Sequence, residues 1–489
     1  MSMIKAENLT FAYPSSCDNV FENVNFQIDT DWKLGFVGRN GRGKTTFLNL
    51  LLGKYEYSGK IISSVQFDYF PCAVADKSRS TESVLQEVCP LAEEWEIMRE
   101  LSYLEVDADV LWREFETLSN GEQTKTLLAA LFLNDGHFLL IDEPTNHIDS
   151  KARELVAKYL KKKKGFILVS HDRSFLDSCV DHILSINRAS IEVQSGNFSS
   201  WMANFERQQE FEAAQNEKIQ KDIGRLQKAV KRSAAWSDQV EASKYGAGVP
   251  DRGYVGHKAA KMMKRSKTIE ARAQNAIEQK SELLKNTETS EKLKLAPLLH
   301  YADALVSLRD VAACYDGRAV CEPVTFSVRR GERAALDGRN GSGKSSLLKL
   351  INGEHIEHTG TLELASGIVI SYVSQDTSHL RGNLSDFAYE NHIDESLMKA
   401  ILRKMDFERI QFEKDMQDFS GGQKKKVLIA KSLCEQAHLY VWDEPLNYID
   451  IYSRMQIEQV IKEFSPAMVF VEHDSAFRAA IATKTIQLK

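Results

Sequence analysis

Two short stretches of the chain combine glycines, a lysine and a hydroxyl residue at a spacing that suits a polyphosphate. They read GRNGRGKTT at 38–46 and GRNGSGKSS at 338–346, and both fit the pattern GxxxxGK[ST]. The glycines let backbone N–H groups turn towards phosphates, the lysine adds a positive charge, and the hydroxyl suits Mg²⁺. The expected phosphate-binding residues are Gly38, Asn40, Gly41, Gly43, Lys44, Thr45 and Thr46, and Gly338, Asn340, Gly341, Gly343, Lys344, Ser345 and Ser346.

Four further motifs follow each loop in the same order. After the first loop they are LSNGEQ at 118–123, FLLIDEP at 138–144, NHID at 146–149 and SHD at 170–172. After the second loop they are FSGGQ at 419–423, YVWDEP at 440–445, NYID at 447–450 and EHD at 472–474. With these motifs the chain resembles the ATP-binding cassette superfamily, in which they are the signature, the acidic strand end, the D-loop and the switch histidine.

The resemblance implies ATP and Mg²⁺ as cofactors, and it gives each acidic or basic group a role that suits its chemistry. An aspartate at the end of a buried strand can hold Mg²⁺, the next glutamate can orient or deprotonate the attacking water, and the histidine can reach the γ-phosphate. The implied catalytic residues are Glu143, Glu444, His171 and His473. The implied metal ligands are Thr45, Asp142, Ser345, Gln375 and Asp443.

The resemblance also implies composite sites, in which the signature of one copy closes over the nucleotide held by the other. Lys44 would pair with Ser420 and Gly422, and Lys344 would pair with Ser119 and Gly121. The signature residues expected to bind nucleotide are Ser119, Gly121, Glu122, Ser420, Gly421, Gly422 and Gln423.

Tyr13 and Tyr315 each close the first short strand of a copy and resemble the aromatic platform that stacks on adenine. The alternative is that each is an ordinary core tyrosine.

The two copies differ near the expected sites. The Q-loop glutamine is Gln375 in the second copy, whereas Cys72 occupies the matching position in the first. In the D-loops, Tyr448 stands where the first copy has His147. These differences leave open whether the two sites turn over equally, although both glutamates are present, which favours hydrolysis at each.

Each copy predicts an α/β domain with a mainly parallel sheet of the P-loop type, together with a helical subdomain. The expected elements are strands at 33–37, 137–142, 333–337 and 439–443, and helices at 45–52 and 345–351. We expect cassette domains at 1–198 and 301–489, joined by a linker at 199–300.

The linker predicts a long antiparallel helical hairpin, whose first helix is expected from about Trp201 to Glu241. Apolar residues recur at helical spacing from Trp201 to Val230 and again from Met262 to Leu283, and a glycine-rich turn lies at 243–258. Cations outnumber acids in this region, for example Lys218, Lys221, Arg225 and Lys228. Such an excess indicates a polyanionic partner. The alternative is a solvated coiled-coil spacer.

The tip of the hairpin mixes cations with rings, a composition that suits phosphate contact and base stacking on RNA. The residues expected to contact RNA are Lys244, Tyr245, Arg252, Tyr254 and His257. The alternative is a turn whose sequence is loosely constrained.

Composition excludes several other classes of protein. The 489 residues are 43% apolar, the formal net charge is −6, and the 7 cysteines form no CxxC pair. This argues against zinc, iron–sulfur clusters and a disulfide framework. The sequence shows neither a signal peptide nor an apolar run long enough to span a bilayer, so we expect a cytoplasmic protein.

Tandem cassettes with a charged linker, Glu122 in the signature and the NHID loop resemble the ABC-F family of ribosome-binding ATPases over essentially the whole chain. The long linker without an arm or C-terminal extension resembles the antibiotic-resistance members of the Lsa type. The resemblance implies a monomer with paired cassettes that enters the exit site of the 70S ribosome, near the peptidyl-transferase centre and the P-site tRNA. The alternatives are a housekeeping ABC-F translation factor and the ATPase subunit of an uptake transporter.

Overall fold

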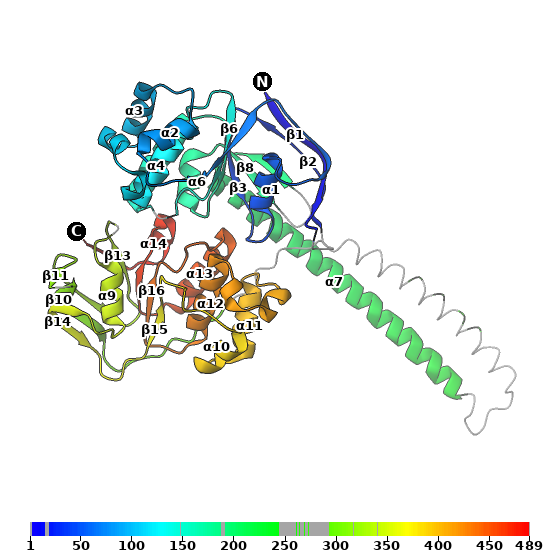
Figure 1. The fold of residues 1–489 in the computed structure, drawn as a ribbon. Coiled ribbons are helices and arrows are strands. Elements are labelled where there is room, and N and C mark those ends of the chain that lie inside the picture. The colour runs from blue at the N-terminus through cyan, green and yellow to red at the C-terminus, as the bar shows by residue number, and fades with distance from the viewer. Residues whose placement is uncertain are drawn as a thin grey trace. The chain divides into compact units, whose positions relative to one another are not determined.

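The computed structural model describes residues 2–14, 19–146, 148–186, 191–243, 261, 264, 268, 272, 293–315, 317–339 and 341–488. The chain divides into two compact units, Met1–Trp201 with Ser290–Lys489, and Met202–Thr289. The first unit holds two α/β domains of similar design (Figure 1). The domain boundaries expected at 198/199 and 300/301 remain predictions.

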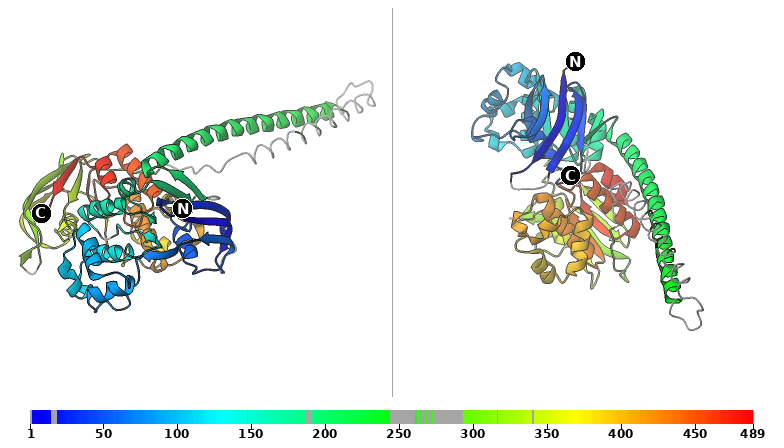
Figure 2. Two further views of the ribbon diagram at one scale, coloured as in Figure 1. Left: turned by 90° about the horizontal axis from the view of Figure 1, so that it is seen from above. Right: turned by 90° about the vertical axis from the view of Figure 1, so that its right-hand side faces the viewer.

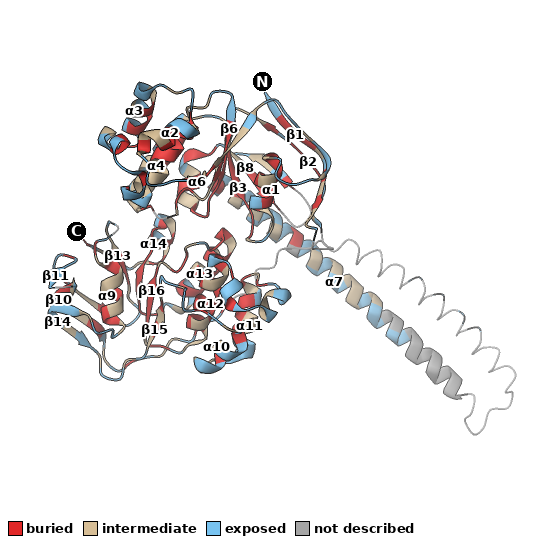
Figure 3. Cartoon of the chain, in the orientation of Figure 1, coloured by how far each residue is buried: buried red, intermediate tan, exposed pale blue. Residues whose placement is uncertain are grey.

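The main sheet of the first α/β domain has the strand order β5-β6-β7-β3-β8-β9. Its strands are β3 (Lys33–Val37), β5 (Gln66–Phe70), β6 (His137–Asp142), β7 (Phe166–Val169), β8 (His182–Ile186) and β9 (Ile191–Ser195). All neighbours pair in parallel except β8 and β9. The central strands are almost wholly buried, as Figure 3 shows, which fits their continuous apolar sequences.

A second, antiparallel sheet with the order β2-β1-β4 completes this domain. Its strands are β1 (Met3–Ala12), β2 (Asn19–Asp29) and β4 (Ser58–Ser63), and the helices are α1 (Lys44–Leu51), α2 (Thr81–Val88), α3 (Glu94–Tyr103), α4 (Asn120–Leu131), α5 (Ser150–Lys162) and α6 (Arg173–Cys179). Phe47 of α1 meets Phe26 of β2 and Phe36 of β3, with ring centroids 5.2 and 5.1 Å apart. The helix after the glycine-rich loop is therefore packed against both sheets.

The second α/β domain repeats this plan, with a parallel sheet in the order β15-β16-β17-β13-β18 and an antiparallel sheet of β10, β11, β12 and β14. Its strands are β10 (Ala304–Tyr315), β11 (Arg318–Ala319), β12 (Val324–Arg329), β13 (Arg333–Asp337), β14 (Glu357–Leu364), β15 (Ile370–Val373), β16 (Leu439–Asp443), β17 (Met468–Val471) and β18 (Lys484–Gln487). Its helices are α9 (Lys344–Ile351), α10 (Leu384–Glu390), α11 (Glu395–Lys404), α12 (Gly421–Cys434), α13 (Ile451–Phe464) and α14 (Ser475–Ile481).

The predicted fold class, two P-loop α/β domains with mainly parallel sheets, is confirmed (Figure 2). Strands β3, β6, β13 and β16 have the predicted bounds. Helices α1 and α9 begin one residue earlier than predicted, at the lysine of each loop. The reason is that the preceding glycine, in the left-handed conformation, is already the N-cap.

The linker begins with one long helix, α7 (Phe198–Ser243), which starts three residues before and ends two residues after the expected helix at 201–241. In the expected second helix, Lys264, Thr268 and Arg272 are described and are helical, and the remaining positions lie outside the described residues. Among the helices that the structure describes, none has the length and apolar character needed to cross a bilayer.

Candidate nucleotide sites

The first glycine-rich loop joins β3 to α1, and its glycines determine its shape. Gly41 and Gly43 have φ of 82° and 87°, in the left-handed region that other residues rarely adopt. A Cβ on Gly43 would lie 2.6 Å from Cγ1 of Val20. Lys44 Nζ donates to the carbonyl oxygen of Gly38 at 2.7 Å, so the loop and its lysine form one compact unit.

The second loop repeats this geometry between β13 and α9. Gly341 and Gly343 have φ of 83° and 78°, and Lys344 Nζ donates to the carbonyl oxygen of Gly338 at 2.8 Å. The remaining loop residues lie where the sequence predicts, at the start of α1 and α9. They are Thr45, Thr46, Ser345 and Ser346.

At the first site, Asp142 lies at the carboxyl end of β6 beside the start of α1. Its Oδ2 accepts hydrogen bonds from Thr45 Oγ1 at 3.1 Å and from the hydroxyl of Tyr69 at 3.0 Å. Burial raises the pKa of Asp142, and these two hydrogen bonds oppose the rise. The parallel sheet thus brings together the hydroxyl and the carboxylate that the sequence assigned to one metal site.

At the second site, the matching Asp443 is 1% exposed and both of its carboxylate oxygens are buried, with the Ser345 hydroxyl as the neighbouring side-chain donor. Burial raises the pKa of Asp443 to about 6. A buried carboxylate in this state needs a cation or a donor to offset the lost hydration. The residues present therefore fit Mg²⁺, which would be held by Asp443 and the Ser345 hydroxyl and would neutralise phosphate charge.

The two glutamates differ in their surroundings. Glu444 accepts hydrogen bonds from Gln375 Nε2 at 2.8 Å and Asn447 Nδ2 at 2.7 Å, and His473 Nε2 lies 3.3 Å from its other oxygen. Burial alone would raise the pKa of Glu444, but His473, Gln375 and Asn447 outweigh burial and lower it to about 2. Gln375, which the sequence assigned to the metal, therefore lies against the glutamate.

Glu143 has fewer donors among the described residues, the backbone N–H of His171 being one. His171 Nε2 lies 3.4 Å from Glu143 Oε1, and that oxygen is buried without a hydrogen-bond partner among the described residues. Burial, followed by the charge of Asp142, raises the pKa of Glu143 to about 8. Cys72 occupies the position of the missing glutamine and is half-buried.

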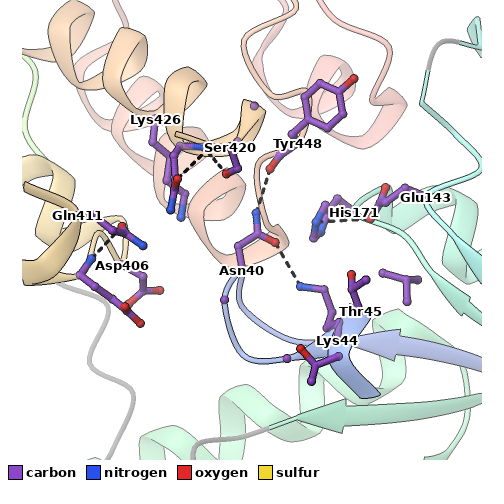
Figure 4. A pocket seen from close by; sticks show the side chains of 18 of the residues that line it. Asn40, Lys44, Thr45, Glu143, His171, Asp406, Gln411, Ser420, Lys426 and Tyr448 are labelled. Atoms are coloured by element: carbon purple, nitrogen blue, oxygen red, sulfur yellow. Dashed lines mark hydrogen bonds and ion pairs between the residues drawn. The ribbon is translucent and has the colours of Figure 1, made fainter. Parts of the chain in front are cut away.

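Residues from both α/β domains line one cavity of about 590 Å³ around Lys44, shown in Figure 4. This volume is ordinary for a small-molecule site. From the first domain the lining includes Tyr13, Asn40, Gly41, Gly43, Lys44, Thr45, Thr46, Asp142, Glu143 and His171. From the second domain it includes Asp406, Phe407, Glu408, Gln411, Ser420, Gly421, Gly422, Gln423, Lys426 and Tyr448. The expected meeting of Lys44 with Ser420 and Gly422 is thus present.

The signature serines cap helices. Ser119 is the N-cap of α4 and Ser420 is the N-cap of α12, and each forms a capping box with the residue three positions on. Glu122 Oε2 accepts hydrogen bonds from the N–H and the hydroxyl of Ser119, both at 2.8 Å. Glu122, which was expected to bind nucleotide, thus forms hydrogen bonds with the N-cap of its own helix. Gln423 occupies the corresponding position on α12.

The two candidate adenine platforms lie differently. Tyr13 lines the cavity, donates or accepts a hydrogen bond with Thr46 Oγ1 at 2.6 Å, and contacts Phe11 edge to face. Tyr315 ends β10 and is exposed. Stacking on adenine remains a prediction for both rings.

The signature glycine of the second composite pair, Gly121, is less crowded than Gly422 of the first pair. A Cβ on Gly422 would lie 2.5 Å from the carbonyl oxygen of Tyr448 and 3.5 Å from Asn40 Nδ2 of the other domain. A Cβ on Gly121 would meet only Ile148 Cγ2, at 3.7 Å, among the described residues within 4 Å. Asp149 of the first domain nevertheless acts electrostatically on Lys344, which places the first D-loop near the second lysine.

Several predicted residues lie outside the described part of the chain. They are Asn340 in the second loop, His147 in the first D-loop, and the expected RNA contacts Lys244, Tyr245, Arg252, Tyr254 and His257.

Sequence reasoning missed contacts that join distant segments. Lys426 Nζ forms an ion pair with Asp450 Oδ2 at 2.9 Å, deep within the second domain. Arg39 of the first loop forms an ion pair with Asp406 of the second domain. The basic residues after the second signature were a signal for the first of these pairs, because a lysine so close to a buried helix start needs an acid.

Comparison with known families decides the assignment. The family model described as ABC transporter matches residues 21–146 and 321–447, which together make up more than half of the chain. The chain belongs to this ATP-binding cassette family. It is accordingly an ATPase with two cassettes, and the residues matched include both glycine-rich loops and both strands that end in Asp-Glu.

Relatives of this cassette protein extend over nearly its whole length. It is 26% identical over 478 residues to the ribosome protection protein VmlR of Bacillus subtilis, which covers 95% of this chain and 83% of that protein. It is 27% identical to the ATP-binding protein Uup of Caulobacter vibrioides, over 96% of this chain and 74% of that protein. It is 25% identical to ABC transporter F family member 2 of Arabidopsis thaliana, over 100% and 76%. These similarities support the ABC-F branch.

Solved structures share the cassette fold. A crystal structure of the archaeal ribosome recycling factor aABCE1 in complex with the stalk protein aP1 aligns with a TM-score of 0.63 at 18% identity, over 98% of this chain and 87% of that chain. An RNase-L Inhibitor structure aligns with a TM-score of 0.61, also at 18% identity, over 98% and 87%. At this identity the likeness shows the fold alone.

Proposed function

We propose that this cassette protein is a ribosome-binding ATPase that protects the 70S ribosome from antibiotics of the peptidyl-transferase centre. ATP closes the paired cassettes, the linker enters the exit site near ribosomal RNA and the P-site tRNA, and hydrolysis releases the protein. The drug classes are lincosamides, pleuromutilins and streptogramin A. Support comes from the similarity to VmlR over 95% of the chain and from a one-sided row of exposed cations on α7.

Five of the seven cations of α7 form one stripe along the helix, and this observation carries the proposal of an RNA partner. All of its members are exposed, and they are Lys218, Lys221, Arg225, Lys228 and Arg232. At about 100° per residue these five positions fall within an arc of about 80° on the helix. Ile219, Ile223 and Leu226, on a different face, are half-buried. Helix α7 as a whole carries seven cations and seven acids, so the proposal rests on the one-sided row of cations, which suits the phosphates of a nucleic acid strand.

Two acids reduce this charge only in part. Lys221 Nζ lies 2.5 Å from Glu217 and Arg225 Nη1 lies 3.6 Å from Asp222, but all four side chains are well exposed. Exposed pairs of this kind contribute little stability and exchange readily with solvent. The stripe therefore remains available to phosphates, and binding would release counterions.

In the proposed reaction, the oxygen of water bonds to the γ-phosphorus and the bond from that phosphorus to the bridging oxygen breaks. The electron pair leaves with ADP, and the proton passes to the glutamate, Glu143 or Glu444. Lys44 and Lys344 would bind the outer phosphates, and Ser119 and Ser420 would complete the cage at the helix N-termini. Mg²⁺, when bound, would neutralise phosphate charge.

The RNA contact is tested by the salt dependence of ribosome binding. Four substitutions, Lys218→Gln, Lys221→Gln, Arg225→Gln and Lys228→Gln, should weaken binding and reduce the slope of log K against log salt by about 3. A matched control removes the same charge from the exposed cassette residues Lys60, Lys77, Lys158 and Lys164 and should leave the slope unchanged. An equal slope in wild type and the α7 variant would refute RNA contact along this stripe.

Antibiotic protection is tested separately in a drug-sensitive host. Expression of the wild type should raise the inhibitory concentration of the three drug classes, and expression of the Glu143→Gln/Glu444→Gln variant should not. Unchanged inhibition despite ribosome binding would favour the housekeeping translation factor. Membrane association in place of ribosome binding would favour the transporter subunit.

A further inference from the structure

Arg39 of the first glycine-rich loop is held by the second α/β domain. Its side chain is 8% exposed, its guanidinium forms an ion pair with Asp406, and its Cζ lies 5.1 Å from the ring centroid of Tyr452. A guanidinium over an aromatic ring is attractive, and burial strengthens both contacts. The next residue, Asn40, donates its Nδ2 to the carbonyl oxygen of Tyr448 at 2.9 Å. We call Arg39, Asp406 and Tyr452 the Arg39 clamp.

The matching arginine of the second loop has a different environment. Arg339 is exposed, whereas Arg39 is buried. The acid that matches Asp406 is Glu105, because each follows the helix before a signature and has a positive φ, 58° and 49°. Glu105 is also exposed. The ion pair between Arg39 and Asp406 at the first site thus has counterparts of the same charges, Arg339 and Glu105, at the second site.

The third member of the clamp has no such counterpart. Tyr452 is the second residue of α13, and the second residue of α5 is Lys151. The charges of Lys151 and Glu105 both act on Lys125, so they occupy one region of the first domain. If the second site closed in the same geometry, Arg339 would meet the ammonium group of Lys151, whereas Arg39 meets the ring of Tyr452. Because like charges repel, closure of the second site is disfavoured, whereas the contacts of Arg39 favour closure of the first site.

An independent difference concerns the carboxylates that would position water. Gln375 and Asn447 both donate to Oε2 of Glu444, at 2.8 and 2.7 Å, and His473 lies 3.3 Å from Oε1, so the orientation of Glu444 is fixed. Glu143 Oε1 is buried without a hydrogen-bond partner among the described residues, and Cys72 occupies the glutamine position. A thiol is a short and weak donor and cannot replace the amide. The Lys344 site, which uses Glu444, thus has the better oriented carboxylate for hydrolysis. The Lys44 site has the more favourable contacts for closure.

We propose that the two sites have different tasks, with the Lys44 site retaining its nucleotide behind the Arg39 clamp and the Lys344 site opening and hydrolysing in each cycle. In this division Arg39, Asp406 and Tyr452 are positioning residues that set how long the first site stays closed. The inference rests on the proposed function because it assumes that both sites bind ATP.

Reciprocal exchange of the two differing residues tests the division. Tyr452→Lys places a lysine opposite Arg39 and should speed release of retained nucleotide from the Lys44 site about tenfold. Lys151→Tyr removes the repulsion at the second site, so retention should rise from about one towards about two nucleotides per chain and turnover should fall about threefold. The measurements are radiolabelled ATP retained after rapid desalting with Mg²⁺, and steady-state phosphate release.

Two further variants separate the clamp from damage to the fold. Tyr452→Phe keeps the ring and should restore retention, and Lys158→Tyr on the exposed face of α5 controls for a new tyrosine on that helix. For hydrolysis, Glu444→Gln should lower turnover about tenfold more than Glu143→Gln. The inference would be overturned if the two exchange variants retained equal amounts of nucleotide and the two glutamine variants lost equal fractions of ATP turnover.

The inference and the proposed function fail on different results. If the exchange variants behave as expected but the trapped protein does not bind ribosomes, the division of tasks stands and the ribosomal role falls. If ribosomes bind but both sites retain and hydrolyse nucleotide equally, the ribosomal role stands and the division falls.

Discussion

Gly43 is subject to two constraints that other residues cannot meet together. Its φ of 87° lies in the left-handed region, and a Cβ there would lie 2.6 Å from Val20 Cγ1 and 3.0 Å from Phe21 Cζ. Gly41 shares the first constraint, with φ of 82°, but a Cβ there would meet nothing within 4 Å. This pair of neighbours separates backbone strain from crowding in one loop.

We therefore expect Gly43→Ala to destabilise the protein more than Gly41→Ala. The left-handed backbone costs an alanine about 1–2 kcal/mol at either position, and crowding adds about 1–3 kcal/mol at Gly43 only. The measurement is the thermal unfolding midpoint of each variant without nucleotide. An equal drop in the two midpoints would show that the loop relaxes around the added methyl group.

At the scale of elements, helix α12 is fixed to the start of α13 by a buried ion pair. Lys426 Nζ lies 2.9 Å from Asp450 Oδ2, with exposed side-chain fractions of 5% and 0%, and it also donates to the carbonyl oxygen of Met405 at 2.6 Å. The matching Lys125 of α4 is only half-buried. The pair thus links the signature helix to the D-loop more tightly in the second domain.

Lys426→Met should destabilise the second domain by about 3–5 kcal/mol, because it leaves the buried carboxylate of Asp450 without its cation. Lys125→Met should cost about 1 kcal/mol or less, since solvent screens that site. Denaturant unfolding followed by tryptophan fluorescence includes the signal of Trp442, which is buried in β16 and donates a hydrogen bond to Ser432 of α12. Similar costs for the two substitutions would contradict the assignment of a tighter link.

The same scale shows what sequence alone could predict. Strands β3, β6, β13 and β16 were predicted with their bounds, because apolar runs that end in glycine or in Asp-Glu mark buried parallel strands. Their meeting at one edge of the sheet follows from parallel order, so the contact of Thr45 with Asp142 was foreseeable. The extent of α7 was predicted to within three residues at either end.

Contacts between the two domains could not be predicted in the same way. The Arg39 clamp joins residues more than 360 positions apart, and nothing in the spacing of Arg39, Asp406 or Tyr452 pairs them. The hydrogen bonds from Tyr69 to Asp142 and from Gln375 to Glu444 depend on side-chain packing that the periodicity of the sequence does not encode. The sequence did reveal the substitution at Cys72, and the structure supplies its consequence for Glu143.

At the scale of the whole molecule, the proposed function couples two nucleotide sites to a helix that carries a row of cations on one face. The cassettes supply closure, since one cavity is lined from both domains, and α7 supplies a one-sided row of charge. Neither feature alone requires a ribosome. Together with similarity to VmlR along 95% of the chain, they favour a ribosomal partner over a transporter.

The most direct test is co-sedimentation of the Glu143→Gln/Glu444→Gln variant with purified 70S ribosomes in ATP and Mg²⁺ at moderate salt. The proposed function predicts that this trapped protein moves with the ribosomes and that it dissociates when ATP is left out. A trapped protein that remains at the top of the gradient while still binding ATP would contradict it.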